Sequence, residues 1–238
     1  MRRAESWYKH SLDAKCDDDK FIFLWVAFNA ADGRALLDPN VHNGSARSAQ
    51  KEWNKLEGFL GKLLDKDTEQ TIRGVLWGPR LSDLQGDGLL HGPVPRLLSE
   101  QYVYCFFWYY VHNGVEHYAV DDDWRTEFHK TNDRSAKYLR SSKASIAEVR
   151  YVLKQVFSRL YTLRNQTFHG GTTYGPEGKG RQQLADATEV MKALVPAILR
   201  ILQTDIDSDR ETDFWETVAY PHVDKEGRLI DEGNPTTD

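Results

Sequence analysis

Cysteine is scarce in this sequence: its 238 residues include only Cys16 and Cys105. Two cysteines are too few for a disulfide framework, and these two lack the short spacing of paired metal ligands. We therefore expect two buried thiols in a protein of the reducing cytoplasm.

Long apolar runs are missing as well. The most apolar stretch, residues 21–31, is shorter than the roughly 20 residues that a membrane-spanning helix requires. The N-terminal segment has no apolar region of the kind that a signal peptide contains. The sequence therefore predicts neither secretion nor a membrane partner, and its 40% hydrophobic and 28% charged residues are typical of a soluble globular protein.

A net basic charge is also absent. The formal net charge is −5, which argues against a protein coated with basic residues for binding nucleic acid. The charge is uneven, however: residues 125–181 contain twelve Lys or Arg and four Asp or Glu, a local balance of +8, whereas the remainder balances to −13. Such a segment fits either a confined site for a polyanion or ordinary solvated helix faces.

Most of the chain shows helical periodicity, interrupted by breaks that contain Gly, Asp or Pro. We expect helices over about 4–15, 17–37, 46–64, 145–164 and 182–203. Residues 78–95 are rich in glycine and proline and are expected to form a long loop. The end of the chain from Asp205 holds eleven acidic and three basic residues, so we expect it to finish in a flexible tail.

Residues 102–124 fit two structures. Asn113-Gly114 lies between aromatic runs, a pattern typical of a β-hairpin. The same pair can instead end a helix, with Trp124 opening the next one. The helix is favoured because the rest of the chain is helical.

The clearest helical pattern follows Ser145. Ser145 is a natural N-cap, and Glu148 three residues later completes a capping box. Apolar residues then recur at steps of three and four and should face one core or partner helix: Ile146, Val149, Leu153, Val156, Leu160 and Leu163. The later helix also has one apolar face, and Pro196 should kink it.

The helix expected over 145–164 ends next to residues whose side chains can take part in catalysis. Arg164, Asn165 and His169 come just before Gly170 and Gly171. On a continuous helix, Arg164 and His169 would differ by roughly 140° in azimuth. A break at the glycines, or a second subunit, would be needed to bring an arginine and a histidine together.

These residue types suit RNA cleavage without a metal. Histidine can take the proton of a ribose 2′-OH or supply one to the leaving 5′-oxygen. Arginine can stabilise the extra negative charge of the pentavalent phosphate. Asn165 could orient the histidine or bind a phosphate oxygen. Arg159, Tyr174, Lys179 and Arg181 are the candidates for binding RNA or phosphate, and for Tyr174 and Arg181 an ordinary loop surface is an equal alternative.

Other candidates have simpler explanations. His112, His117 and the acidic residues 121–123 lack a firm metal-ligand spacing, so neither a metal nor another cofactor is expected. Aromatic residues could stack on bases, but core or dimer contacts are favoured at their helical spacing: Trp7, Trp25, Phe28 and the cluster 102–110. Asn29 is read as a satisfied buried amide, with a supporting role at the site as the alternative.

The run RLYTLRNQTFHGGTTYG, followed by RQQLADATEVMKALVPAILRIL, resembles the signature region of the HEPN superfamily and its Apea-like HEPN group. The segments WYKHSLDAKCDDDKFIFLWVAFNAADGR and FWETVAYPHVD are similar to the opening and closing parts of that group. The resemblance extends from about residue 7 to residue 223 and is weakest in the central loop and the tail.

The resemblance implies an all-α helical bundle over residues 1–220, followed by an acidic tail over 221–238. It implies a homodimer in which the motifs of two subunits meet, and a bacterial metal-independent endoribonuclease that leaves a 2′,3′-cyclic phosphate. Arg164, Asn165 and His169 occupy the motif positions. Such enzymes act in stress, toxin–antitoxin or phage-defence systems, so RNA and an antitoxin or regulatory protein are the implied partners. The alternative is a non-catalytic HEPN module that binds RNA, nucleotide or protein, or serves as a dimerisation scaffold.

Overall fold

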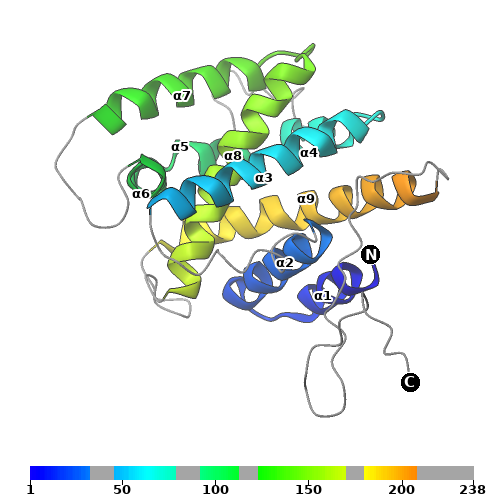
Figure 1. The fold of residues 1–238 in the computed structure, drawn as a ribbon. Helices are drawn as coiled ribbons and strands as arrows, with labels where there is room; N and C mark the ends of the chain where they lie inside the picture. The colour runs from blue at the N-terminus through cyan, green and yellow to red at the C-terminus, as the bar shows by residue number, and fades with distance from the viewer. Residues whose placement is uncertain (33–45, 79–91, 113–122, 170–179, 208–238) are drawn as a thin grey trace, which may run out of the picture.

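The computed structural model describes residues 1–32, 46–78, 92–112, 123–169 and 180–207, without the side chains of 46–51 and 205–207. These residues form α-helices and no strands (Figure 1). The helices are α1 (Arg2–Asp13), α2 (Asp17–Asp32), α3 (Ala46–Lys66), α4 (Thr71–Trp77), α5 (Pro93–Ser99), α6 (Gln101–His112), α7 (Asp123–Leu139), α8 (Ile146–Phe168) and α9 (Arg181–Asp207). The predicted all-α class is confirmed for this part of the chain.

Each of the five expected helices is present, as α1, α2, α3, α8 and α9. The helix is also confirmed for the aromatic run, since α6 ends at His112, while Asn113-Gly114 lies outside the described residues. The expected loop at 78–95 is wrong at its end, because α5 begins at Pro93, where proline suits the first turn of a helix. Residues 79–91 and the predicted tail from 208 onward lie outside the described residues.

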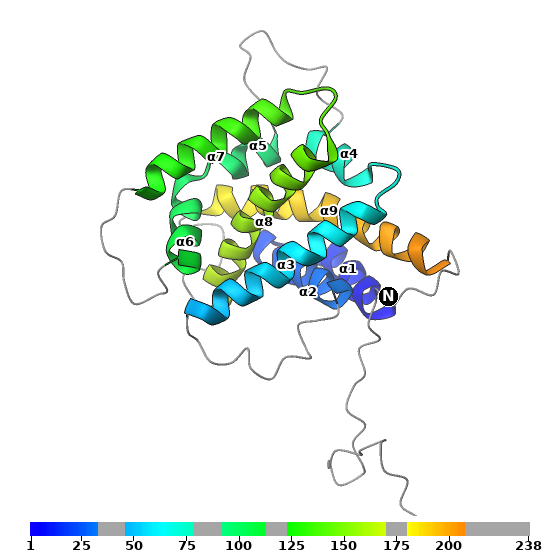
Figure 2. The ribbon, with the colours of Figure 1, turned by 45° about the horizontal axis from the view of Figure 1, so that its top comes forward.

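Helix α8 lies at the centre of the arrangement and contacts helices from both ends of the chain. Figures 1 and 2 show α7 on one side of the molecule and α1 and α2 on the other, with α9 between them. Helix α9 packs against α2 and α5, whereas α7 packs against α6 and α8. The main apolar core draws buried side chains from every described helix, from Ala4 in α1 to Leu202 in α9.

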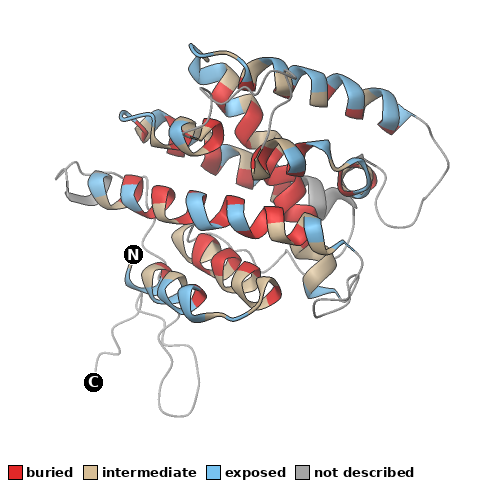
Figure 3. Cartoon of the chain, turned by 180° about the vertical axis from the view of Figure 1, so that it is seen from behind, coloured by how far each residue is buried: buried red, intermediate tan, exposed pale blue. Residues whose placement is uncertain are grey.

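The apolar seam of α8 is buried at five of its six predicted positions. Ile146 is the exception at 54% exposed, because it is the first residue of the helix and lies where α8 reaches the surface. The middle of the helix is buried on all sides: residues 156–163 are all buried, as the red central part of Figure 3 illustrates. This burial explains why Arg159, which sits within that run, does not reach the surface.

The N-terminus of α8 carries the predicted capping box. The Ser145 hydroxyl accepts a hydrogen bond from the Glu148 main-chain N–H, and the Glu148 carboxylate accepts one from the Ser145 N–H at 2.7 Å. The two hydrogen bonds that the Glu148 carboxylate accepts, from the Ser145 main-chain N–H and from the Ser145 hydroxyl, hold the pKa of Glu148 below its usual value. The cap therefore satisfies two N–H groups that the helix itself leaves without partners.

Changing Ser145 to alanine should lower the free energy of unfolding by about 1 kcal/mol at neutral pH, because the cap would be lost. The wild-type cap should weaken as the pH falls through the lowered pKa of Glu148, since protonation removes the stronger acceptor. Urea unfolding of both proteins at pH 7 and pH 3 measures this. An unchanged midpoint at pH 7 would contradict the assigned cap.

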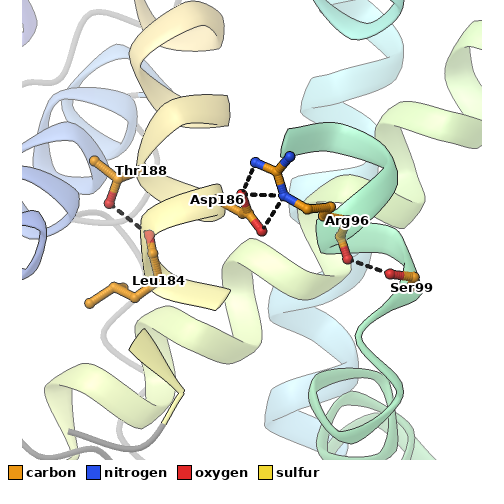
Figure 4. Close-up of polar contacts among 5 residues, drawn as sticks. All are labelled: Arg96, Ser99, Leu184, Asp186 and Thr188. Carbon is orange, nitrogen blue, oxygen red and sulfur yellow. Dashed lines mark hydrogen bonds and ion pairs between the residues drawn. The ribbon is translucent and has the colours of Figure 1, made fainter. Parts of the chain in front are cut away.

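Two ion pairs with buried carboxylates fasten α9 to neighbouring helices. Arg96 of α5 donates from Nε to both oxygens of Asp186, at 2.9 and 3.1 Å (Figure 4). Arg181 donates through its two terminal nitrogens to the two oxygens of Asp18 in α2, at 2.7 and 2.6 Å. The pKa of each arginine is raised, chiefly by the hydrogen bond to its carboxylate. The apolar face of α9 is buried as predicted, and the helix continues through Pro196 to Asp207.

Candidate active site at the end of helix α8

Helix α8 extends four residues past its predicted end, to Phe168, so Arg164 and Asn165 lie in its last turns. His169 is the C-cap residue, and its main-chain N–H donates to the Asn165 carbonyl at 3.0 Å. The His169 side chain is exposed, as is that of Phe168. Gly170 and Gly171 lie outside the described residues.

The helix does not fold back to join its arginine to its histidine. Among the contacts of the described residues, none connects the Arg164 guanidinium with the His169 imidazole. The two side chains lie at the same end of α8, but one is half-buried between helices and the other faces outward. A site composed of two subunits, as the resemblance implies, stays a prediction.

Arg164 is held in a box of aromatic rings and polar groups. Its Cζ atom lies 5.6 to 5.9 Å from the ring centroids of Trp25, Tyr161 and Phe168, within the range of cation–π attraction. Its Nη1 donates to Asn165 Oδ1 at 2.7 Å, and the same atom lies 3.9 Å from Glu52 Oε1. The Nε atom of Arg164 is buried and has no acceptor within the described part of the chain. The guanidinium is therefore oriented, yet its hydrogen-bonding capacity is not exhausted.

A chain of hydrogen bonds runs beside this arginine and links three helices. The Tyr161 hydroxyl donates to Glu52 Oε2 at 2.6 Å, and the hydroxyl oxygens of Tyr161 and Tyr110 are 3.1 Å apart. Because Tyr161 has one hydroxyl proton, Tyr110 acts as the donor between the two tyrosines. Burial, together with the Glu52 carboxylate, raises the pKa of Tyr161 far above its usual range. Tyr161 thus stays neutral, and its hydroxyl orients the carboxylate of Glu52, a residue of α3.

Three carboxylates of α3 face three basic side chains of α8. The pairs are Glu52–Arg164, Glu57–Lys154 and Asp65–Arg150, with closest N–O distances of 3.9, 2.7 and 2.8 Å. We call them the α3–α8 charge row; their order along the chain makes the two helices antiparallel. Together with the Arg181–Asp18 pair, the charge row neutralises part of the predicted basic segment 125–181 within the protein.

Of the four predicted RNA- or phosphate-binding residues, the structure describes Arg159 and Arg181, and both have partners within the protein. Tyr174 and Lys179 lie outside the described residues. Arg181, the first residue of α9, donates through both of its terminal nitrogens to the carboxylate of Asp18 in α2. Arg159 is only 1% exposed, so a solvent phosphate cannot reach it in this conformation.

Arg159 is instead an interior cation. It donates to Gln155, Ser158 and the Leu98 carbonyl, and its Cζ atom lies 4.5 Å from the ring centroid of Tyr104. All of these acceptors are neutral, and no described residue supplies an acceptor for the Arg159 Nε atom. Burial lowers the pKa of Arg159 to about 10. The folded state therefore disfavours the charged form of this side chain.

Replacing Arg159 with methionine should leave the free energy of unfolding unchanged or raise it by about 1–3 kcal/mol at pH 7, because an uncompensated interior charge is removed. Since the folded state binds the Arg159 proton less tightly than the unfolded state, this charge lowers stability below pH 10, and the penalty fades as the pH rises above 10. Urea unfolding at pH 7 and pH 10.5 tests both statements. A strong loss of stability at pH 7 would mean that the neutral acceptors compensate the charge.

The remaining candidates are mainly structural. Trp25 and Phe28 are buried in the core. In the cluster 102–110, Tyr104 and Tyr109 join a small second core with α7, whereas Tyr102 and Phe106 are exposed. Asn29 is half-buried. Cys16 and Cys105 form no disulfide with each other, and both are half-buried, so the expectation of two buried thiols is met only in part.

Within the described ranges, no group of His, Cys, Asp or Glu could hold a metal ion, and His117 and residues 121–122 lie outside them. No helix in the same ranges has the length and apolarity needed to cross a membrane.

Comparisons with known proteins do not assign the chain: no protein-family model matches it, and neither a curated protein nor a solved structure is significantly similar to it.

Asn165 was a predicted site residue, but Glu52, Tyr161 and Tyr110 were not predicted from the sequence as part of the surroundings of Arg164. Tyr161 precedes Arg164 by three residues and so shares its side of the helix, a spacing that could have indicated it. Nothing in the sequence connects Glu52 or Tyr110 with the motif, because their approach depends on how α3 and α6 pack against α8.

Proposed function

We propose that this protein is a metal-independent endoribonuclease whose catalytic residues are Arg164 and His169, with Asn165 as a positioning residue. The observation that carries the proposal is the end of α8, where an oriented guanidinium is followed, five residues later, by an exposed histidine. The likeness of the motif to that of HEPN ribonucleases adds to it. A bacterial stress, toxin–antitoxin or phage-defence role is part of the proposal, as is a homodimer that brings two motifs together.

In the proposed reaction, the ribose 2′-oxygen attacks its neighbouring phosphorus while the bond to the 5′-oxygen breaks. A histidine removes the 2′-OH proton, and the 5′-oxygen receives a proton as it leaves, from a second histidine or from water. The products are a 2′,3′-cyclic phosphate and a 5′-hydroxyl. Arg164 stabilises the added negative charge on the phosphate oxygens, and Asn165 Oδ1, bound to Nη1, supports the orientation of the guanidinium.

A second candidate is a non-catalytic module that binds RNA, nucleotide or protein at the same place. Two observations favour it: Arg164 faces the carboxylate of Glu52, and within one chain it does not contact His169. The two candidates differ in one measurable result, which is covalent change of the RNA.

The test is incubation of the wild-type protein with total RNA and with defined tRNAs in EDTA, followed by gel analysis. The ribonuclease proposal expects cleavage that persists in EDTA and disappears in the His169→Ala variant. Binding of RNA without cleavage of any of these substrates would favour the module.

A further inference from the structure

The pair that includes Arg164 is the loosest of the α3–α8 charge row. The other two pairs have N–O distances of 2.7 and 2.8 Å, whereas Arg164 Nη1 and Glu52 Oε1 are 3.9 Å apart. The second oxygen of Glu52 is held by the Tyr161 hydroxyl at 2.6 Å, which keeps the carboxylate near α8. Glu52 thus lies close enough to attract the guanidinium but does not hydrogen-bond to it.

Two N–H groups of Arg164 and Trp25 have no acceptor among the described residues. They are the Arg164 Nε and the Trp25 Nε1, which are both buried, and the Trp25 residue is only 2% exposed. The Trp25 ring centroid lies 5.9 Å from Arg164 Cζ. Because buried donors without acceptors are unfavourable, a rearrangement that brings an oxygen acceptor to the Arg164 guanidinium would be favoured.

We propose that Glu52 is the resident counter-ion of Arg164 and that a phosphodiester of RNA displaces this contact when it binds. The identity of the ligand rests on the proposed function. Phosphate oxygens form charge-assisted, often bidentate bonds with a guanidinium, which the present distance to Glu52 does not allow. The Glu52 carboxylate lowers the affinity of Arg164 for every other anion. RNA must therefore bind strongly enough to compete with Glu52 for the guanidinium. Tyr161 and Tyr110 keep Glu52 in place for this competition.

Glu52→Gln is the decisive variant because it removes the charge while its amide oxygen still accepts from Tyr161. The probe is a fluorescent RNA oligonucleotide with 2′-O-methyl riboses. It lacks the 2′-hydroxyl that attacks the phosphate, so the proposed reaction cannot cleave it. We expect Glu52→Gln to bind this probe roughly fivefold more tightly, as expected for loss of a half-exposed competing charge. Glu52→Ala, which removes the charge with a different change of shape, should show the same gain.

Glu57→Gln is the matched control. This variant also removes one carboxylate charge from α3, but that of the pair with Lys154. Its affinity for the RNA probe should stay within twofold of the wild-type affinity. In an Arg164→Ala background, Glu52→Gln should give no gain, because the group that it releases is absent. The proposal is overturned by equal affinities of wild type and both Glu52 variants, by an equal gain in Glu57→Gln, or by absence of probe binding in all of them.

This result is separate from the outcome of the cleavage test. If natural RNA is cleaved, Glu52→Gln should lower KM with little change in kcat, a split that mere loosening of the fold would not produce. If RNA is never cleaved but the Glu52 variants gain affinity, the ribonuclease proposal fails and the counter-ion role stands. If cleavage depends on His169 but the Glu52 variants bind the probe as wild type does, the counter-ion role fails alone.

Discussion

Replacing His169 with alanine is expected to lower the rate of RNA cleavage by about 10²- to 10⁴-fold, the usual contribution of a positioned acid or base. His169 is exposed, and its cap hydrogen bond comes from the main-chain N–H, which alanine retains. The fold should therefore be unaffected, so that the loss reports on chemistry. Initial rates on a labelled substrate RNA, with circular dichroism of each protein, measure the effect.

His129→Ala provides the matched control, because His129 is an exposed histidine on α7. It should cleave RNA at the wild-type rate. Arg164→Ala should lose about 10²- to 10³-fold, since a donor to the charged phosphate is lost. Arg164→Lys should recover only part of this loss, because lysine keeps the charge but not the planar fork. Full activity of His169→Ala would reject the histidine as a catalytic residue.

Replacing Arg181 with alanine is expected to lower the free energy of unfolding by about 3 kcal/mol, because it leaves the buried Asp18 carboxylate without its partner. The pair joins the first turns of α2 and α9, which also pack along each other. Loss of the pair should weaken the packing of α2 against α9, and with it the attachment of α1 and α2 to the rest of the helices. Urea unfolding at pH 7 measures the effect.

Lys192→Ala is the control on the same helix. Lys192 and Glu189 form an exposed pair at 2.8 Å, and its loss should change the free energy of unfolding by less than about 0.5 kcal/mol. Equal effects of the two variants would contradict the structural role of the Arg181–Asp18 pair. If the pair has this structural role, any loss of RNA binding in Arg181→Ala should be explained by its lower stability and not by the loss of a direct contact with phosphate.

The helices that could be predicted are those whose own sequence specifies them. Helix α8 begins where the Ser145–Glu148 pair predicts, because a capping box is a local signal that tertiary packing does not need to create. The short helices α4 and α5 were not predicted, since seven residues give too little periodicity to distinguish a helix from a loop. Ile146 fits the apolar pattern yet is exposed, because the pattern carries no information on where the covering helices end.

The candidate site shows the same division. Arg164, Asn165 and His169 could be selected from one stretch of sequence because of their chemistry. Glu52 and Tyr110 could not, since they come from α3 and α6 and meet α8 only through packing. Arg159 illustrates the opposite error: its charge indicated a surface role, but α8 is buried on all sides at that point.

The most direct test of the central claim is the chemistry of the cut ends. Wild-type protein would be incubated with a substrate RNA in EDTA, and the 3′ ends of the products would be identified by mass spectrometry. The account predicts 2′,3′-cyclic phosphates with 5′-hydroxyls on the adjoining fragments, and none of these products from His169→Ala. Products with 3′-hydroxyl and 5′-phosphate ends, or cleavage that EDTA abolishes, would contradict attack by the 2′-oxygen at this site.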